Sequence, residues 1–158
     1  MNKWILMSIL AVLLVAGAFG IVYSNAREPY DAALDEAVQR AAKEAKLTSV
    51  DDFYLYNGSE TIYSVIGKQK NGTEMAVWIP ENTKQPVTIK KLADGISEQE
   101  AIKKLYSEEN PNKLLGVRLG MEKELPVWEL AYLDENSNLS YYYIHFDTGK
   151  WWRKIENL

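Results

Sequence analysis

The chain has 158 residues, with 18 basic and 22 acidic side chains that give a formal net charge of −4 at pH 7. A nucleic-acid-binding surface needs clustered lysines and arginines to neutralise phosphates, so this balance argues against a nucleic-acid partner. The absence of cysteine excludes disulfide bonds, thiolate metal ligands and cysteine nucleophiles.

The first predicted element is a hydrophobic segment at residues 5–23, which carries no charged side chain. A helix needs about 20 apolar residues to cross a bilayer, so residues 1–26 are expected to form a transmembrane anchor. Lys3 then places the N-terminus in the cytoplasm and the rest of a single-pass cell-membrane protein outside. The alternative is a cleaved signal peptide, because residues 24–26 have the small–x–small pattern of a cleavage site.

The next segment is expected to form a first α+β domain at residues 27–94. Apolar positions from Tyr30 to Ala45 recur with helical spacing, which predicts a helix at residues 27–48. Antiparallel strands are expected after it, at residues 52–56, 61–69, 74–79 and 87–91. The pair Asn71 and Gly72 is a strong signal for a hairpin turn between the second and third of these strands.

A second domain of the same order is expected at residues 95–158. Ser97 and Glu100 have the spacing of a capping box, which predicts a helix that runs to about residue 107. Further strands are expected at residues 114–121, 127–133, 139–146 and 151–155. The predicted fold class is therefore α+β, with the N-terminal transmembrane helix followed by two units, each with one helix packed on a curled antiparallel sheet.

The two predicted domains also align with one another without a gap. The aligned pairs include Ile62 with Val127, Tyr63 with Trp128, Trp78 with Tyr143 and Ile79 with Ile144. A match that keeps strands and turns in phase indicates a repeated supersecondary unit.

The polar residues give no convincing catalytic set. His145 is the only histidine, it lies in the middle of a predicted strand, and no partner for general-base work is indicated. Residues 147–149 have the Asp-Thr-Gly sequence of aspartic proteases, but residues 82–84 are Asn-Thr-Lys, so the second aspartate of a dyad is missing. We expect no enzyme activity, no metal site and no cofactor, although a wall hydrolase or polysaccharide-binding protein stays a hypothesis.

The aromatic residues are the best candidates for a functional surface. Along strand 139–146, alternation sends Tyr141 and Tyr143 to the face opposite Tyr142. If the helix covers the Tyr142 face, the opposite sheet face carries the candidates for partner binding, which are Trp78, Tyr141, Tyr143, Trp151 and Trp152. The open alternative is that the two domains, or two chains, bury these sheet faces against each other, since exposed aromatic patches are uncommon on monomers.

Residues 127–132 (Val-Trp-Glu-Leu-Ala-Tyr) and 141–150 (Tyr-Tyr-Tyr-Ile-His-Phe-Asp-Thr-Gly-Lys), after the capped helix, resemble the PepSY-like family. With the hydrophobic segment and the repeat included, nearly the whole chain resembles the membrane-anchored cell-wall elongation regulators of Bacillus-type bacteria, which have tandem cystatin-like or PepSY-like domains. The first unit departs from the family pattern at residues 82–84.

This resemblance implies a non-enzymatic extracytoplasmic interaction module that regulates cell-wall elongation by binding a penicillin-binding protein. The alternative that it implies is a protease-inhibitor or chaperone-like module of the cell envelope. Fold analogy is a weak argument for either function.

Overall fold

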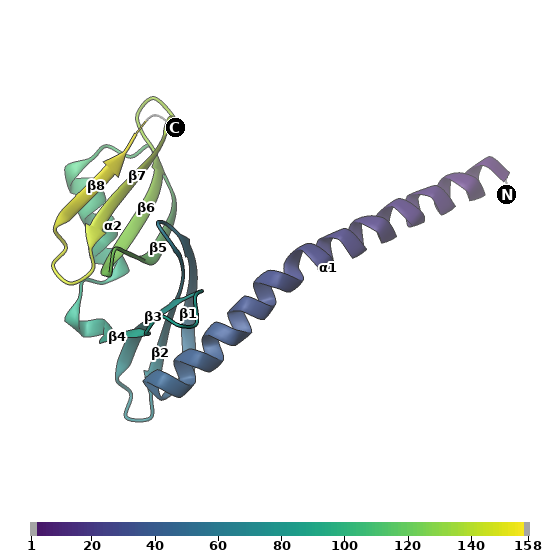
Figure 1. Cartoon of the computed structure of the whole chain (residues 1–158). Coiled ribbons are helices and arrows are strands. Elements are labelled where there is room, and N and C mark those ends of the chain that lie inside the picture. The colour runs from purple at the N-terminus through teal and green to yellow at the C-terminus, as the bar shows by residue number, and fades with distance from the viewer. Residues whose placement is uncertain (1–2, 157–158) are drawn as a thin grey trace. The chain divides into compact units, whose positions relative to one another are not determined.

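The computed structural model describes residues 3–156 and divides the chain after Glu36 into a helical unit and a strand-rich unit (Figure 1). The helices are α1 (Lys3–Ala45), the short 3₁₀ helix η1 (Leu92–Asp94) and α2 (Glu98–Glu108). The strands of the first sheet are β1 (Leu47–Asn57), β2 (Thr61–Gln69), β3 (Glu74–Pro80) and β4 (Thr88–Lys91). The strands of the second sheet are β5 (Lys113–Glu122), β6 (Leu125–Leu133), β7 (Leu139–His145) and β8 (Trp151–Ile155).

Helix α1 corrects the prediction for the N-terminal third of the chain. The structure has one continuous helix of 43 residues, which passes through Pro29, where we predicted an anchor followed by a separate helix. Within the described part of the chain, no helix has the length and apolar character that a membrane span requires. The transmembrane helix expected at residues 1–26 is therefore wrong.

Both sheets are antiparallel meanders in which the strands pair in sequence order. In the first sheet the β2–β3 hairpin closes at the predicted turn, where Gly72 has a φ of 82°. That left-handed conformation is accessible to glycine at little cost. In the second half of the chain the capping box forms as predicted, because Ser97 Oγ accepts from the Glu100 N–H at 3.2 Å and the Ser97 N–H donates to Glu100 Oε2 at 2.8 Å.

The first sheet is covered on both faces. One face packs against the end of α1 through the small side chains Ala37, Ala41 and Ala45. The other face carries Tyr56 and Trp78, which belong to the same core as α2 and the second sheet. Small residues on α1 let its last turns approach the first sheet closely.

The two sheets of the strand-rich unit therefore share one hydrophobic core. Trp78 packs edge-to-face on Phe146 with ring centroids 5.3 Å apart, and Tyr54 packs in the same way on Trp128 at 6.1 Å. The expectation of two cystatin-like or PepSY-like units, each with a helix on one face of its own sheet, is wrong because the first sheet buries its second face against the second half of the chain. The domain bounds 27–94 and 95–158 stay a prediction.

A buried carboxylate also connects the two sheets. Glu122, at the end of β5, is only 4% exposed and accepts hydrogen bonds from the Tyr56 hydroxyl at 3.0 Å and the Ser59 N–H at 3.2 Å. Gly120 leaves room for the Tyr56 ring, since a Cβ atom at this position would lie 2.4 Å from the ring carbons. The hydrogen bonds and the close packing hold β1 and β2 against β5.

Candidate functional site

The second sheet has one face that α2 does not cover. Figure 1 shows α2 on one side of the sheet, and α2 contacts that side through the buried Ala101 and Leu105. The strand register places Arg118, Glu129, Tyr143 and Arg153 in one row across the opposite side. We call this side the aromatic–arginine face and define it by Arg118, Glu129, Tyr141, Tyr143, Trp152 and Arg153.

Glu129 organises the centre of this face. Its carboxylate accepts from Arg118 Nη1 at 2.9 Å and from the Tyr143 hydroxyl at 2.9 Å, through its two different oxygens. Burial raises the pKa of Tyr143 well above its usual value, and the charge of Glu129 adds to this effect. Tyr143 therefore stays neutral near pH 7, keeps its proton for the bond to Glu129, and fixes its ring in the middle of the sheet.

The guanidinium of Arg153 lies against two aromatic rings. Its central carbon is 4.6 Å from the centroid of the Tyr143 ring and 4.7 Å from that of Trp152. The two rings pack edge-to-face at 5.9 Å, and Tyr141 stacks on Tyr143 at 6.4 Å. Cation–π contacts of this kind hold a guanidinium in a fixed orientation without neutralising its charge.

Three of the five aromatic residues predicted from the sequence lie together on this face. Tyr141 and Trp152 are partly exposed there, whereas Tyr143 is only 5% exposed. Trp151 is 55% exposed at the first residue of β8, and Trp78 is fully buried between the sheets. A direct contact of Trp78 with a partner would therefore require the two sheets to separate, and the binding role of the other four residues stays a prediction.

The sequence reasoning missed the charged members of the face, namely Arg118, Glu129 and Arg153. Each is an ordinary charged residue in its own strand, and no local pattern distinguishes it. The strand register could have revealed these three residues, because residues at directly opposed positions of neighbouring strands share one face of a sheet. Aligning β5 to β8 by their turns would have brought the three together.

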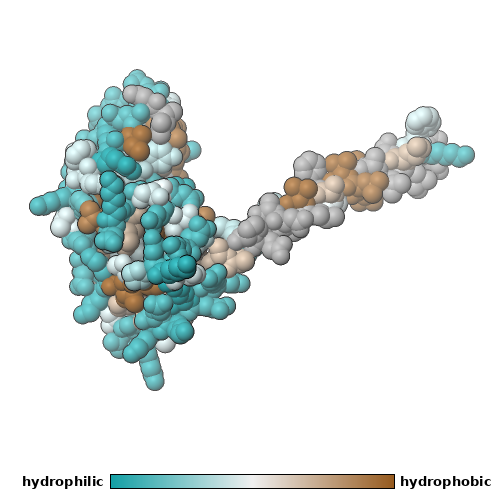
Figure 2. Space-filling model, viewed as in Figure 1, coloured by the Kyte–Doolittle hydropathy of each residue, from teal (hydrophilic) through white to brown (hydrophobic). Residues whose placement is uncertain are grey.

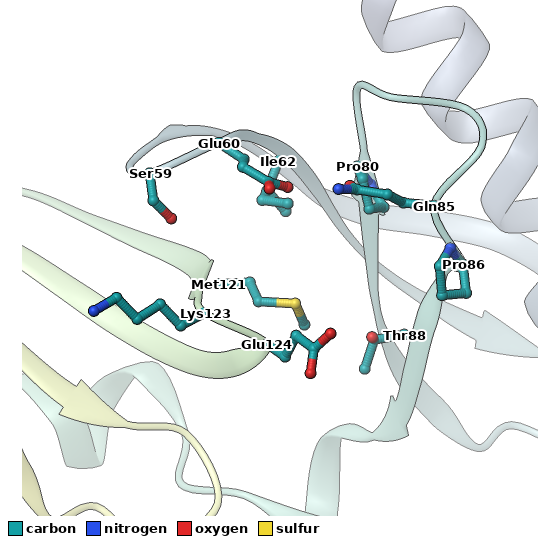
Figure 3. A pocket seen from close by; sticks show the side chains of 10 residues that line it. All are labelled: Ser59, Glu60, Ile62, Pro80, Gln85, Pro86, Thr88, Met121, Lys123 and Glu124. Carbon is teal, nitrogen blue, oxygen red and sulfur yellow. The ribbon is translucent and has the colours of Figure 1, made fainter.

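A groove on another part of the strand-rich unit is the second candidate (Figure 3). Its volume is about 530 Å³, and it lies between the first sheet and the β5–β6 turn. The lining residues are Ser59, Glu60, Ile62, Pro80, Gln85, Pro86, Thr88, Met121, Lys123 and Glu124. Arg40 holds one wall in place by donating to the Gln85 carbonyl at 2.9 Å and the Pro80 carbonyl at 3.4 Å.

The chemistry of this groove is mixed and gives no clear ligand class. Figure 3 shows the side chains of Lys123 and Glu124 at its rim and Met121 facing its interior. Both rim residues have positive φ, 48° and 66°, which is unusual outside glycine and indicates a constrained turn. The groove lining includes neither His145 nor a hydroxyl nucleophile paired with a base.

Most of the strand-rich surface is hydrophilic in the view of Figure 2, with only small hydrophobic areas. The ring of His145 lies 6.3 Å from that of Trp152, at the border of the aromatic–arginine face. Among the described residues, no three His, Asp or Glu side chains come together in a way that could hold a metal ion. The arrangement of the aromatic–arginine face is suited to holding another molecule through ring contacts and a fixed cation.

Comparison with known proteins places the chain among cell-wall regulators. Residues 36–80 match the family described as "Cell wall elongation regulator TseB-like domain". The chain is 36% identical over 141 residues to a Bacillus subtilis (strain 168) protein named "Probable cell wall elongation regulator TseB", which covers 89% of this chain and 86% of that protein. It also matches the solved structure of "YpmB protein from Bacillus subtilis" with a TM-score of 0.72 and 35% identity, over 77% of this chain and 95% of that one. The chain therefore belongs to the TseB-like family of cell wall elongation regulators.

Proposed function

We propose that this chain regulates cell wall elongation as a non-enzymatic module that binds a penicillin-binding protein on the outer side of the cytoplasmic membrane. The observation that supports a binding role is the aromatic–arginine face, which lies on the side of the second sheet away from α2. Family membership directs the choice of partner to the proteins that build the wall. Penicillin-binding proteins are the class that the sequence resemblance implies.

The composition of the face fits protein recognition. Tyrosine, tryptophan and arginine are the residues most enriched at the energetic centres of protein interfaces. Here the rings of Tyr141 and Trp152 are partly exposed. The hydrogen bonds of Glu129 fix the neighbouring side chains of Arg118 and Tyr143. A surface that is ordered before binding loses less conformational freedom when the partner arrives.

The proposal is tested by photo-cross-linking in cells. Benzoylphenylalanine replaces Tyr141 on the aromatic–arginine face or, as a matched control, Tyr106, an exposed tyrosine on α2. After irradiation, a fluorescent penicillin labels every penicillin-binding protein covalently, so that a cross-linked partner is seen as a fluorescent band of higher mass. We expect this band with the substitution at Tyr141 and not with the substitution at Tyr106.

The same experiment separates this function from the alternatives. A cross-linked product at Tyr141 that contains an envelope protease and no penicillin label would favour the protease-inhibitor function. A labelled band from Tyr106 with none from Tyr141 would place the contact elsewhere and refute the proposed surface. Protease digestion of intact protoplasts tests the location, since a strand-rich unit outside the membrane is degraded while cytoplasmic proteins survive.

A further inference from the structure

The outer edge of β8 lies beside the stacked arginine. Within the part of the chain that the structure describes, β8 pairs only with β7, so the backbone groups on its other side have no strand partner there. Arg153 is in the middle of this edge strand, where it faces Tyr143 across the pair with β7. An unpaired strand edge is a template on which an extended chain can add as a further strand.

Arg153 also has no carboxylate partner among the described residues. Within the same residues, its Nε has no hydrogen-bond partner. The next residue, Lys154, by contrast contacts both Glu109 and Glu156. The rings of Tyr143 and Trp152 hold the guanidinium in place, and a guanidinium can bind a carboxylate through two parallel hydrogen bonds.

The charge of this face is opposite to that of the whole chain. The paired positions on this side of the sheet include three cations, Lys113, Arg118 and Arg153, and two carboxylates, Glu129, which Arg118 neutralises, and the buried Glu122 at the end of β5. The chain as a whole has a net charge of −4. A positive surface on an acidic protein selects a negatively charged partner segment and steers it to one place.

We infer that the aromatic–arginine face binds an extended acidic segment of a partner protein, which adds to the outer edge of β8 and places a carboxylate on Arg153. This inference rests on the proposed function and names the kind of segment that the partner supplies. A strand added to β8 lies about 4.8 Å away, and its alternate side chains point to the same face as Arg153 and Ile155. A glutamate of the added strand that lies opposite Arg153 can reach the guanidinium. The exposed ring of Trp151 lies at one end of the same strand edge.

Two synthetic peptides test the inference with the full-length chain. The first is a fluorescein-labelled octapeptide of alternating threonine and glutamate, and the second has glutamine in place of glutamate. Fluorescence anisotropy at low ionic strength should give an affinity about tenfold or more higher for the acidic peptide, since a charge-assisted pair is lost in the other. Hydrogen exchange should slow at the β8 amides and not in α2.

Substitutions of Arg153 in β8 and of Lys150 in the β7–β8 turn show whether Arg153 causes the preference for the acidic peptide. Arg153→Gln should abolish the preference for the acidic peptide, and Arg153→Lys should retain only part of it, because lysine keeps the charge but loses the planar fork. Lys150→Gln, which removes the same charge from the exposed β7–β8 turn, should leave the preference unchanged. Urea unfolding of each variant confirms that the fold is retained.

Several results would overturn the inference. These are equal affinity for the two peptides, no binding of either, an unchanged preference in Arg153→Gln, or protection away from β8. Arg153-dependent sedimentation with purified peptidoglycan, without peptide binding, would assign a wall polymer to this face instead. If a penicillin-binding protein is cross-linked from Tyr141 but neither peptide binds, the proposed function stands and this inference is refuted. If the acidic peptide binds but no penicillin-binding protein is cross-linked, the proposed function is refuted and the binding site for an acidic strand stands.

Discussion

The hydrogen bond between Tyr56 and Glu122 provides a direct test of how the two sheets are held together. In Tyr56→Phe the ring still fills the space beside Gly120, but the hydroxyl that donates to the buried carboxylate is lost. Glu122 is then left with the Ser59 N–H as its remaining donor in this contact. A hydrogen bond to a charged group contributes about 1.5–3 kcal/mol, so the free energy of unfolding should fall by that amount.

Urea unfolding of the full-length protein, followed by tryptophan fluorescence, measures this loss of free energy, and thermal unfolding measures the corresponding change in melting temperature. At roughly 4 °C per kcal/mol for a unit of this size, the melting temperature should fall by about 6–12 °C. The matched control is Tyr106→Phe, because Tyr106 is 52% exposed on α2 and its hydroxyl should be worth less than about 0.5 kcal/mol. A loss in Tyr56→Phe no larger than that in the control would show that the bond does not hold the sheets together.

Three further predictions concern the stability of the strand-rich unit. Ser97→Ala should cost about 1 kcal/mol by removing the helix cap, whereas Ser97→Asp should restore most of it; equal urea midpoints for the two variants would contradict this. Gly120→Ala should cost about 1–3 kcal/mol because its Cβ meets the Tyr56 ring, while Gly116→Ala in the same strand meets nothing within 4 Å and should be nearly neutral; equal losses would refute the packing argument. Burial, with a neighbouring carboxylate, raises the pKa of both Tyr56 and Tyr143 above the usual value of about 10, so the unfolded chain loses these protons first. Stability should therefore be full below about pH 10 and fall as the pH rises further, and urea midpoints that stay constant from neutral pH to pH 11 would contradict this.

The parts of the fold that local signals determine could be predicted from the sequence. Strands β2 (Thr61–Gln69) and β8 (Trp151–Ile155) have the predicted bounds, because turn residues and alternation mark both ends. The capping box at Ser97 was also confirmed, since its two hydrogen bonds involve residues only three positions apart. These signals depend on neighbours in the chain and need no knowledge of the tertiary structure.

Strand β1 shows where local reasoning failed. It was predicted at residues 52–56 but extends over Leu47–Asn57. The register shifts between Leu47 and Ser49 and between Val50 and Asp52, so its first half lacks a regular alternation of apolar and polar residues. A β-bulge removes the periodicity on which strand prediction depends.

The largest errors concerned long-range packing. Turn residues and alternation predicted most strands of both sheets but not that Trp78 would be buried against Phe146, a residue of the other half of the chain. The helix boundary expected near residue 26 was wrong because α1 continues without a break to Ala45. The aromatic half of the candidate face was found from strand alternation, whereas Arg153 required the register of β7 with β8.

We propose that the chain regulates wall elongation through contacts of the aromatic–arginine face. The most direct test is the rate at which a fluorescent D-amino acid enters the lateral wall of cells whose own copy is replaced by Tyr141→Ala/Trp152→Ala. With the variant present at wild-type abundance, we predict the same rate as in cells that lack the protein, and a wild-type rate for the control Tyr106→Ala. Full wild-type incorporation in the double variant would contradict the claim.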